Sequence, residues 1–292
     1  MKKVFLIILI SFSILNSAQQ SEIFKLKNYR VSVLNDSIQE TSGLNFFDEK
    51  LFTFNDSGNP AELYEINKKS GKILKVFKVN AENKDWEALA NDGKNFYIGD
   101  FGNNAGTRKD LKILKIPFNS NKLQTDSLNT VSFYYQEQKD FTSKNISTDF
   151  DLESMIYLNG KLHIFTKEWT SKSTTHYTLD PNNFEKQAAQ KVETFKTGFM
   201  ISDAYYFDKK LYTVGYTKKT EVFLMIFIES EQGIFFNANP QKLYLGSALS
   251  IGQIEGIAVD EKGIYISGEK FHSPFGNTKP YFYFVPKEKL QF

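Results

Sequence analysis

Ile254-Glu255-Gly256-Ile257 is one of five related phrases in this chain of 292 residues. The other four are Thr41-Ser42-Gly43-Leu44, Trp86-Glu87-Ala88-Leu89, Leu152-Glu153-Ser154-Met155 and Ile201-Ser202-Asp203-Ala204. We call the second residue of each phrase its pivot. Each phrase runs into a polar turn, and a second apolar strand begins nine positions after the pivot. A fixed internal offset with variable spacing between copies indicates a repeated supersecondary unit, so the repeat decides the fold class.

Each unit continues into two further short, alternating strands. In the first unit the strands fall at 51–54, 62–66 and 73–79, after the phrase itself. Repeated four-stranded antiparallel units of this length are typical of propeller blades. A parallel β-solenoid is the alternative fold, but its rungs would be shorter and more regular. The sequence therefore predicts an all-β, five-bladed β-propeller of four-stranded antiparallel blades.

The fifth unit lacks a fourth strand, and a strand at 24–34 precedes the first pivot. We expect this N-terminal strand to complete the last blade and close the ring, because closure leaves fewer exposed strand edges. Residues 19–292 are then a single domain. The second and third pivots are 66 residues apart, against 45 to 53 elsewhere, which we interpret as a polar insertion at 137–149.

The first eighteen residues predict a secretory signal peptide. Met1-Lys2-Lys3 is followed by an apolar run at 4–15 and by Asn16-Ser17-Ala18, the order of a cleaved leader. The run is shorter than the about 20 residues of a membrane anchor. We therefore expect cleavage after Ala18 and a secreted or periplasmic protein.

Composition excludes several classes of function. The chain has no cysteine, which excludes disulfides and thiolate metal sites. Its 36 Lys and Arg against 34 Asp and Glu give a formal net charge of +2, so nothing favours nucleic acid or an anionic membrane as a partner. We expect a monomer that binds a small molecule or a surface glycan or peptide.

Propeller geometry predicts where the polar residues meet. The inner strand of each blade lines the central channel, so the five pivots should lie around one mouth of that channel. The loop after the second strand returns to the same face, which brings there Asp56, Asp100, Lys167, Glu269 and Lys270. Four aromatic residues near this face could stack on a base or a sugar: Trp86, Phe101, Trp169 and Tyr216.

The pivots have the composition of a hard-cation site. Three glutamates close together raise one another's pKa unless a positive charge lies among them. Oxygen ligands without His or Cys suit calcium, which takes about six to eight oxygens. We therefore expect a calcium ion to be bound by Ser42, Glu87, Glu153, Ser202 and Glu255. The alternative is that these side chains hydrogen-bond ordered water and neighbouring backbone.

The order Ser, Glu, Glu, Ser, Glu at the pivots resembles the calcium-activated apyrase family of secreted nucleotidases. Asn55-Asp56-Ser57-Gly58 before Leu63-Tyr64-Glu65-Ile66 is similar to an acidic turn of that family. The resemblance implies calcium in the channel and hydrolysis of nucleotide phosphoanhydrides. The family's turn typically carries an arginine, whereas this chain has only Arg30 and Arg108. The region 85–104 also resembles uncharacterised secreted bacterial propellers, which implies no activity.

Three functions follow as hypotheses. In a nucleotidase, Asp56 or Asp100 would orient a water, and the developing charge would be offset by Arg108, Lys167 or Lys270. The second hypothesis is a non-catalytic module that binds a glycan, a peptide or a cell-surface partner. The third is glycoside hydrolysis by the paired acids at 149–153.

Overall fold

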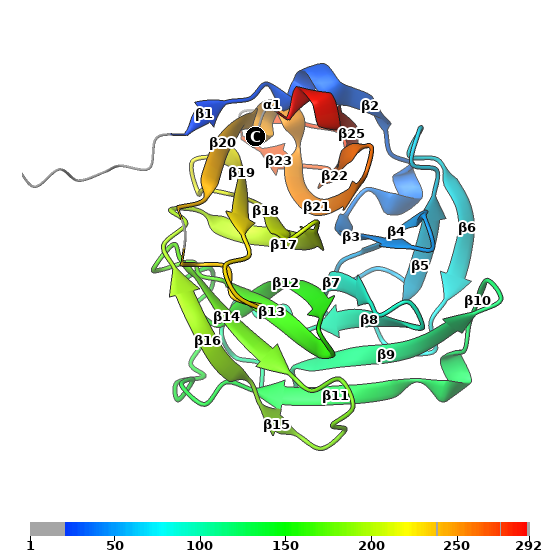
Figure 1. The fold of residues 1–292 in the computed structure, drawn as a ribbon, viewed down its shortest axis with the longest axis vertical. Helices are drawn as coiled ribbons and strands as arrows, with labels where there is room; N and C mark the ends of the chain where they lie inside the picture. The colour runs from blue at the N-terminus through cyan, green and yellow to red at the C-terminus, as the bar shows by residue number, and fades with distance from the viewer. Residues whose placement is uncertain (1–20, 238, 275, 291–292) are drawn as a thin grey trace, which may run out of the picture.

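The computed structural model describes residues 21–237, 239–274 and 276–290. The signal peptide expected at 1–18 lies outside these residues. Five antiparallel sheets surround a common centre and form a five-bladed β-propeller (Figure 1). The fold class predicted from the repeat is therefore confirmed. No helix in the described part of the chain has the length and hydropathy that a membrane span requires.

The blades follow one another along the chain. The first has β3 (Thr41–Phe47), β4 (Lys50–Asn55), β5 (Glu62–Ile66) and β6 (Ile73–Lys78). The second has β7 (Trp86–Asn91), β8 (Asn95–Asp100), β9 (Lys112–Asn119) and β11 (Asn129–Tyr134), with β10 (Lys122–Leu123) beside β9. The third has β12 (Asp151–Leu158), β13 (Lys161–Lys167), β14 (Thr174–Leu179) and β16 (Gln190–Phe195).

The fourth blade has β17 (Met200–Phe207), β18 (Lys210–Tyr216), β19 (Glu221–Ile228) and β20 (Gln241–Ser247). The fifth has β21 (Gln253–Asp260), β22 (Gly263–Glu269) and β25 (Tyr281–Pro286). Its outer strand is β2 (Arg30–Val33), which pairs antiparallel with β25.

Short elements complete the sheets and connections. β15 (Gln187–Ala188), from the third blade's segment, pairs in parallel with the outer strand β11 of the second blade. β1 (Glu22–Ile23) likewise pairs in parallel with β20. Both additions cover a sheet edge that would otherwise present unpaired backbone groups. The remaining elements are a hairpin of β23 (His272–Ser273) and β24 (Gly276–Asn277), four short 3₁₀ helices (Leu26–Tyr29, Asp36–Ile38, Thr125–Ser127 and Lys287–Lys289) and α1 (Ala248–Ile251).

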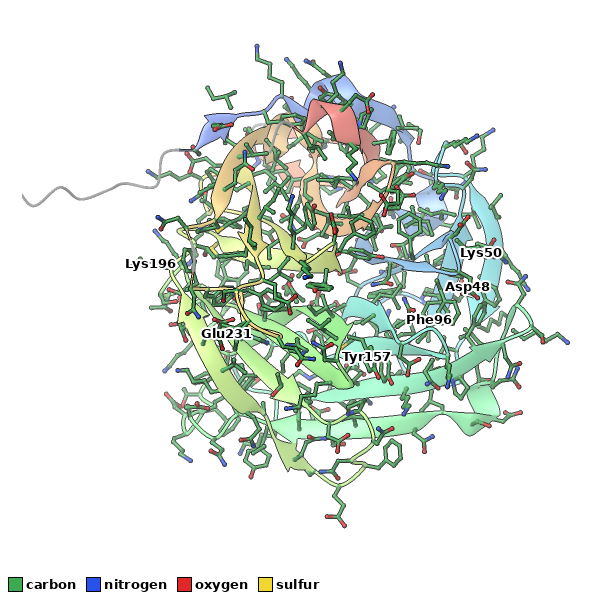
Figure 2. All side chains as sticks on the ribbon, in the orientation of Figure 1. Asp48, Lys50, Phe96, Tyr157, Lys196 and Glu231 are labelled. Atoms are coloured by element: carbon green, nitrogen blue, oxygen red, sulfur yellow. The ribbon has the colours of Figure 1, made fainter. Side chains whose placement is uncertain are left out.

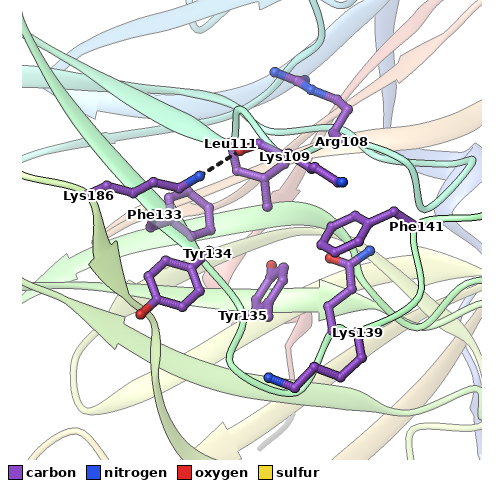
Figure 3. A pocket seen from close by; sticks show the side chains of 10 residues that line it. Arg108, Lys109, Leu111, Phe133, Tyr134, Tyr135, Lys139, Phe141 and Lys186 are labelled. Carbon is purple, nitrogen blue, oxygen red and sulfur yellow. Dashed lines mark hydrogen bonds between the residues drawn. The ribbon is translucent and has the colours of Figure 1, made fainter.

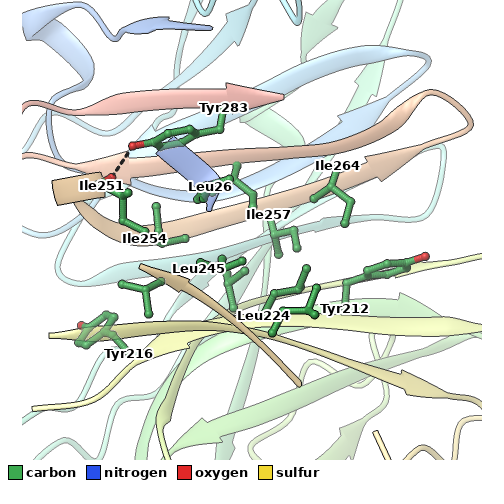
Figure 4. Close-up of a cluster of buried hydrophobic side chains, with 14 of the residues drawn as sticks. Leu26, Tyr212, Tyr216, Leu224, Leu245, Ile251, Ile254, Ile257, Ile264 and Tyr283 are labelled. Atoms are coloured by element: carbon green, nitrogen blue, oxygen red, sulfur yellow. Dashed lines mark hydrogen bonds between the residues drawn. The ribbon is translucent and has the colours of Figure 1, made fainter. Parts of the chain in front are cut away.

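Aromatic side chains pack between the first and second blades, where Figure 2 labels Phe96. Phe47 and Phe52 of the first blade meet Phe96 of the second at ring-centroid distances of 4.7 and 4.9 Å. Between the fourth and fifth blades the contact is largely aliphatic, with residues such as Leu224 facing Ile257 (Figure 4). Burying one such side chain contributes about 1.5–3 kcal/mol, so the blade interfaces hold the ring together without disulfides.

The inner strands β3, β7, β12, β17 and β21 each contact the inner strand of the next blade, and β21 contacts β3. A β-bulge interrupts the pairing of every one of them. In the second to fifth blades the residue that the pairing skips is the pivot: Glu87, Glu153, Ser202 and Glu255. A bulge bends its strand and re-aims a side chain. The bulge thus distinguishes these four side chains from their strand neighbours.

The first blade differs by one position. There the pairing skips Gly43 instead of Ser42, since Ser42 pairs with Phe54 and Leu44 with Thr53. Gly43 has a φ of 68°, a left-handed conformation that glycine adopts at no steric cost. In four blades the pivot is therefore the bulged residue. In the first blade the bulged residue, Gly43, follows the pivot Ser42.

Candidate functional site

A cavity of about 340 Å³ lies at the mouth of the channel. We call it the channel mouth. All five blades contribute to its lining, because the pivots and the loops that follow the second strands share this face. The lining residues are Ser42, Asp56, Glu87, Asn104, Asn145, Ile146, Glu153, Lys167, Trp169, Tyr216, Gln253, Glu255 and Glu269.

Most of the residues expected at this face are in the lining. Of the expected calcium ligands, Ser42, Glu87, Glu153 and Glu255 line the channel mouth. Ser202 does not line it, and its hydroxyl donates to the Ile254 carbonyl at 2.6 Å. Four of the five expected ligands therefore line the channel mouth, and the side chain of the fifth, Ser202, contacts Glu255.

The five residues given catalytic roles divide into two groups. Asp56 and Lys167 line the channel mouth, whereas Asp100, Arg108 and Lys270 do not. Arg108 Nη2 lies 2.9 Å from Asp100 Oδ1 and also donates to the Asp100 carbonyl at 3.1 Å. Asp100 is fully buried in this pair, and Lys270 is exposed. Lys167 is thus the cation that the lining contains.

Lys167 lies within the ring of carboxyl groups. Its Nζ is 2.6 Å from Glu153 Oε1 and donates to the Tyr216 hydroxyl at 2.8 Å. Burial alone would lower the pKa of Lys167, but the surrounding Glu153, Tyr216 and Glu255 raise it well above its usual value. The ammonium therefore stays charged and supplies one positive charge to the site.

Only one of the two carboxylate oxygens of Glu255 has hydrogen-bond partners among the described residues. Its Oε1 accepts hydrogen bonds from the Tyr216 hydroxyl at 3.0 Å and from Gln253 Nε2 at 2.7 Å. The Gln253 amide also donates to Glu269. Glu255 Oε2 is buried and has no hydrogen-bond partner in the described part of the chain. Leaving a charged oxygen in this state is costly, and burial raises the pKa of Glu255 accordingly.

Acidic side chains outnumber basic ones at the channel mouth. Five carboxyl groups line it, against one ammonium. Burial, followed by the neighbouring Glu40 and Glu255, raises the pKa of Asp56 to about 7. Burial and nearby carboxyl groups raise the pKa values of Glu87 and Glu269 well above their usual range. The site is therefore arranged to accept a positive charge.

Two of the four aromatic residues considered for stacking line the channel mouth. Trp169 Nε1 donates to Asp151 Oδ2 at 2.8 Å, which fixes the indole beside the cavity. The Lys167 ammonium lies 5.0 Å from the ring centroids of both Trp169 and Tyr216. Trp86 and Phe101 are instead fully buried in hydrophobic clusters.

Three contributors were missed by the sequence reasoning. Gln253 lies two positions before its pivot, and the period of two in a strand could have identified it. Asn145 and Ile146 come from the insertion at 137–149. This insertion reaches the channel mouth, where the Ile146 amide donates to the Asn104 carbonyl at 2.9 Å. Ile146 has a φ of 45°, which is rare for a β-branched residue. No local sequence signal indicates which face such an insertion covers.

Asp203, the residue after the fourth pivot, stabilises the channel itself. Its carboxyl accepts hydrogen bonds from the amides of Ala204, Leu44 and Ile257 at 2.8, 3.3 and 2.7 Å. These amides belong to three inner strands, β17, β3 and β21. Asp203 thus links three blades across the channel, a structural role that its position in the phrase did not predict.

The donor atoms fit calcium by type. They are carboxylate and hydroxyl oxygens, and Glu255 Oε2 is an unused ligand. As the side chains stand, however, no group of three or more His, Cys, Asp or Glu residues among those described could hold a metal ion. An ion would have to draw the carboxylates together. Glu87, Glu255 and Glu269 are the candidates for this, since Glu153 is held by Lys167.

Comparison with known proteins supports the fold. No protein-family model matches the chain, and no curated protein matches it. A GH43 β-1,3-galactosidase with galactodeoxynojirimycin is similar in structure, with a TM-score of 0.51 and 10% identity over 88% of this chain and 94% of that chain. A putative oxidoreductase (glucose dehydrogenase) from Thermus thermophilus has a TM-score of 0.48 and 10% identity over 88% and 98%.

Hydrazine synthase from Kuenenia stuttgartiensis has a TM-score of 0.41 and 10% identity, covering 84% of this chain and 59% of that chain. This chain thus spans about 59% of the length of that one. The similar structures include propeller enzymes. The apyrase resemblance gains no support from them. At 10% identity, the similarity to the GH43 galactosidase supports the fold alone.

Proposed function

We propose that this protein is a ligand-binding propeller that takes a calcium ion and a small polar ligand at the channel mouth. Glu255 carries the proposal, since its Oε2 is buried without a partner in a cavity where five carboxyl groups face one ammonium. Glu87, Glu255 and Glu269 would hold the ion. Bound calcium would supply positive charge and open coordination positions for ligand oxygens.

The lining favours a hydroxyl-rich ligand such as a glycan over a polyphosphate. Trp169 and Tyr216, which are 9% and 8% exposed, line the cavity beside amide and carboxyl groups, and this combination suits packing and hydrogen-bonding a sugar ring. A polyphosphate needs several cations. Here Lys167 is neutralised by Glu153, and Arg108 by Asp100.

Hydrolysis at the same site is the second candidate, and Asp56 favours it. Burial and neighbouring carboxyl groups raise the pKa of Asp56 to about 7. A carboxyl group with such a pKa can exchange a proton near neutral pH, as a general base or acid must. Phosphate release from nucleoside di- and triphosphates, with calcium and with a chelator, is the measurement. Calcium-dependent release that Asp56→Asn abolishes would establish a nucleotidase in place of a binding module.

Calcium binding is tested by calorimetry and thermal unfolding of the chain from residue 19. We expect calcium, and not magnesium at equal concentration, to raise the melting temperature. At about 100 times the Kd the stabilisation is about 2.7 kcal/mol. Glu255→Gln should abolish the response because it removes the unused charged oxygen.

Glu261→Gln is the matched control. It makes the same chemical change in the turn between β21 and β22, at the other end of the same blade, where the side chain is 83% exposed. This variant should bind calcium as the unaltered chain does. Equal responses of both variants, or no binding at all, would contradict the proposal.

A further inference from the structure

A second cavity, of about 400 Å³, lies at the outer edge of the second blade. We call it the side pocket. It forms where β11 meets the parallel strand β15 and where the insertion leaves the sheet. It shares no lining residue with the channel mouth. The lining residues are Arg108, Lys109, Leu111, Phe133, Tyr134, Tyr135, Gln138, Lys139, Phe141 and Lys186.

The charge of the side pocket is positive. Its lining contains four basic residues and no acidic one. Arg108 is neutralised, since its guanidinium lies 2.9 Å from Asp100 and 3.2 Å from Asp110, and it points away from the pocket's rings in Figure 3. The three lysines of the lining have no ion pair within the described ranges: Lys109, Lys139 and Lys186.

Neighbouring acids do not compensate these lysines. Asp140, next to Lys139, pairs with Lys144 at 2.7 Å. Glu137 is exposed and is not part of the lining. Lys186 Nζ donates to the Lys109 carbonyl at 2.9 Å, which holds the ammonium at the pocket (Figure 3). An ammonium held by a neutral carbonyl retains its full charge for a ligand.

The walls of the side pocket are aromatic. The Lys109 ammonium lies 4.6 Å from the ring centroid of Phe141, and the Lys186 ammonium lies 6.0 Å from that of Tyr134. Tyr134 is 42% exposed, whereas Phe133 beneath it is fully buried. The ammonium groups therefore lie beside rings on which a flat molecule can stack, as Figure 3 shows for the labelled side chains.

We propose that the side pocket binds a planar aromatic anion, a molecule of about one or two rings with a carboxylate, sulfonate or phosphate group. The ring would stack on Tyr134 and Phe141, and the anionic group would meet the lysines. An anion without a ring would leave the aromatic side chains of the pocket in contact with water. An uncharged aromatic molecule would leave the ammonium groups without a counter-ion. The proposal does not depend on the channel mouth, because the two linings are separate.

Naphthalene-2-sulfonate is the probe, and 2-(hydroxymethyl)naphthalene is its uncharged match. Calorimetry on the chain from residue 19 should show that the sulfonate binds more tightly than the alcohol. Replacing two ammonium groups, Lys139→Gln with Lys186→Gln, should weaken sulfonate binding about tenfold and leave the alcohol unaffected. Phe141→Ala should weaken both probes, since it removes the stacking surface.

Lys69→Gln is the matched control, because Lys69 is an exposed lysine in a turn of the first blade. This variant should bind both probes as the unaltered chain does. Thermal unfolding of each variant establishes that it is folded. Equal affinity for the two probes, no sulfonate binding at millimolar concentration, or unchanged binding by the double variant would each overturn the proposal.

Discussion

The channel mouth and the side pocket use charge in opposite ways. At the channel mouth, carboxyl groups from the first, second, third and fifth blades surround the buried ammonium of Lys167, which is held by Glu153 and Tyr216. In the side pocket, lysines near one blade edge lie beside aromatic rings without any carboxylate in the lining. The ammonium of Lys167 is therefore already paired within the protein, whereas the lysines of the side pocket have no carboxylate partner in its lining.

One segment contributes to both regions. The insertion between the second and third pivots gives Gln138, Lys139 and Phe141 to the side pocket and Asn145 and Ile146 to the channel mouth. The two regions thus differ in depth and charge although they share a stretch of loop. The following three experiments test this difference, beginning with the largest effect.

Lys167→Met should be strongly destabilising. It leaves Glu153 buried without its partner, and breaking a buried ion pair from one side costs about 3–5 kcal/mol. Denaturant unfolding measures the loss. Adding Glu153→Gln to the same chain should recover part of it, because the uncompensated charge is then removed.

Lys186→Met is the matched change in the side pocket. Its ammonium group has no carboxylate partner, so the free energy of unfolding should change by less than about 0.5 kcal/mol. Similar losses for Lys167→Met and Lys186→Met would show that the two regions do not differ as described.

The pH dependence of stability should come from the channel mouth and not from the side pocket. Asp56, with a pKa raised to about 7, binds a proton in the folded chain at pH values where the unfolded chain has lost it. Without calcium, the contribution of Asp56 to the free energy of unfolding should therefore fall as pH rises from about 4 to 7, by about 1–3 kcal/mol. Melting temperatures over this range measure the effect.

Two variants isolate this contribution. Asp56→Asn should remove the part of the profile that Asp56 contributes, whereas Lys139→Gln should leave the profile unchanged. His163 acts in the opposite direction, since burial lowers its pKa to about 4 and stability is lost as pH falls from 6.5 to 4. The contribution of Asp56 is therefore read as the difference between the unaltered chain and Asp56→Asn. If the difference in stability between the unaltered chain and Asp56→Asn did not change with pH, the raised pKa of Asp56 would be contradicted.

The smallest expected effect is a different response of the two regions to salt concentration. Raising sodium chloride from about 50 to 500 mM should weaken naphthalene-2-sulfonate binding about fivefold, because exposed charges are screened. The destabilisation caused by Lys167→Met should not change, since a buried pair is screened much less. Salt-independent sulfonate binding would mean that the lysines do not contact the anion.

The sequence predicted the fold because the repeat is local. The nine-residue offset from pivot to second strand is a hairpin, and five hairpins of one kind specify a ring. The same reasoning brought Asp56, Lys167 and the pivot glutamates to one face. The repeat did not predict the β-bulges, because a bulge depends on the register in which two strands pair. The displacement from Ser42 to Gly43 in the first blade was missed for that reason.

Side-chain partners were the least predictable part. Arg108 and Lys167 were expected in the same role. Arg108, in the loop after β8, instead pairs with Asp100 at the end of β8, while Lys167 lies in the ring of carboxyl groups. The side pocket was not foreseen at all. It combines the insertion with Lys186, which precedes a strand that crosses to the neighbouring blade.

The pairing of β2 with β25 has a consequence for how the chain reaches this structure. Residues 30–33 and 281–286 are neighbours in space although about 250 residues separate them in sequence. During synthesis the four main strands of each of the first four blades can pair in turn from nearby segments, but the fifth blade must wait until β25 has left the ribosome. Until then β2 has an open edge, and such long-range pairing is slow. The ring therefore assembles last at the seam where its two ends meet.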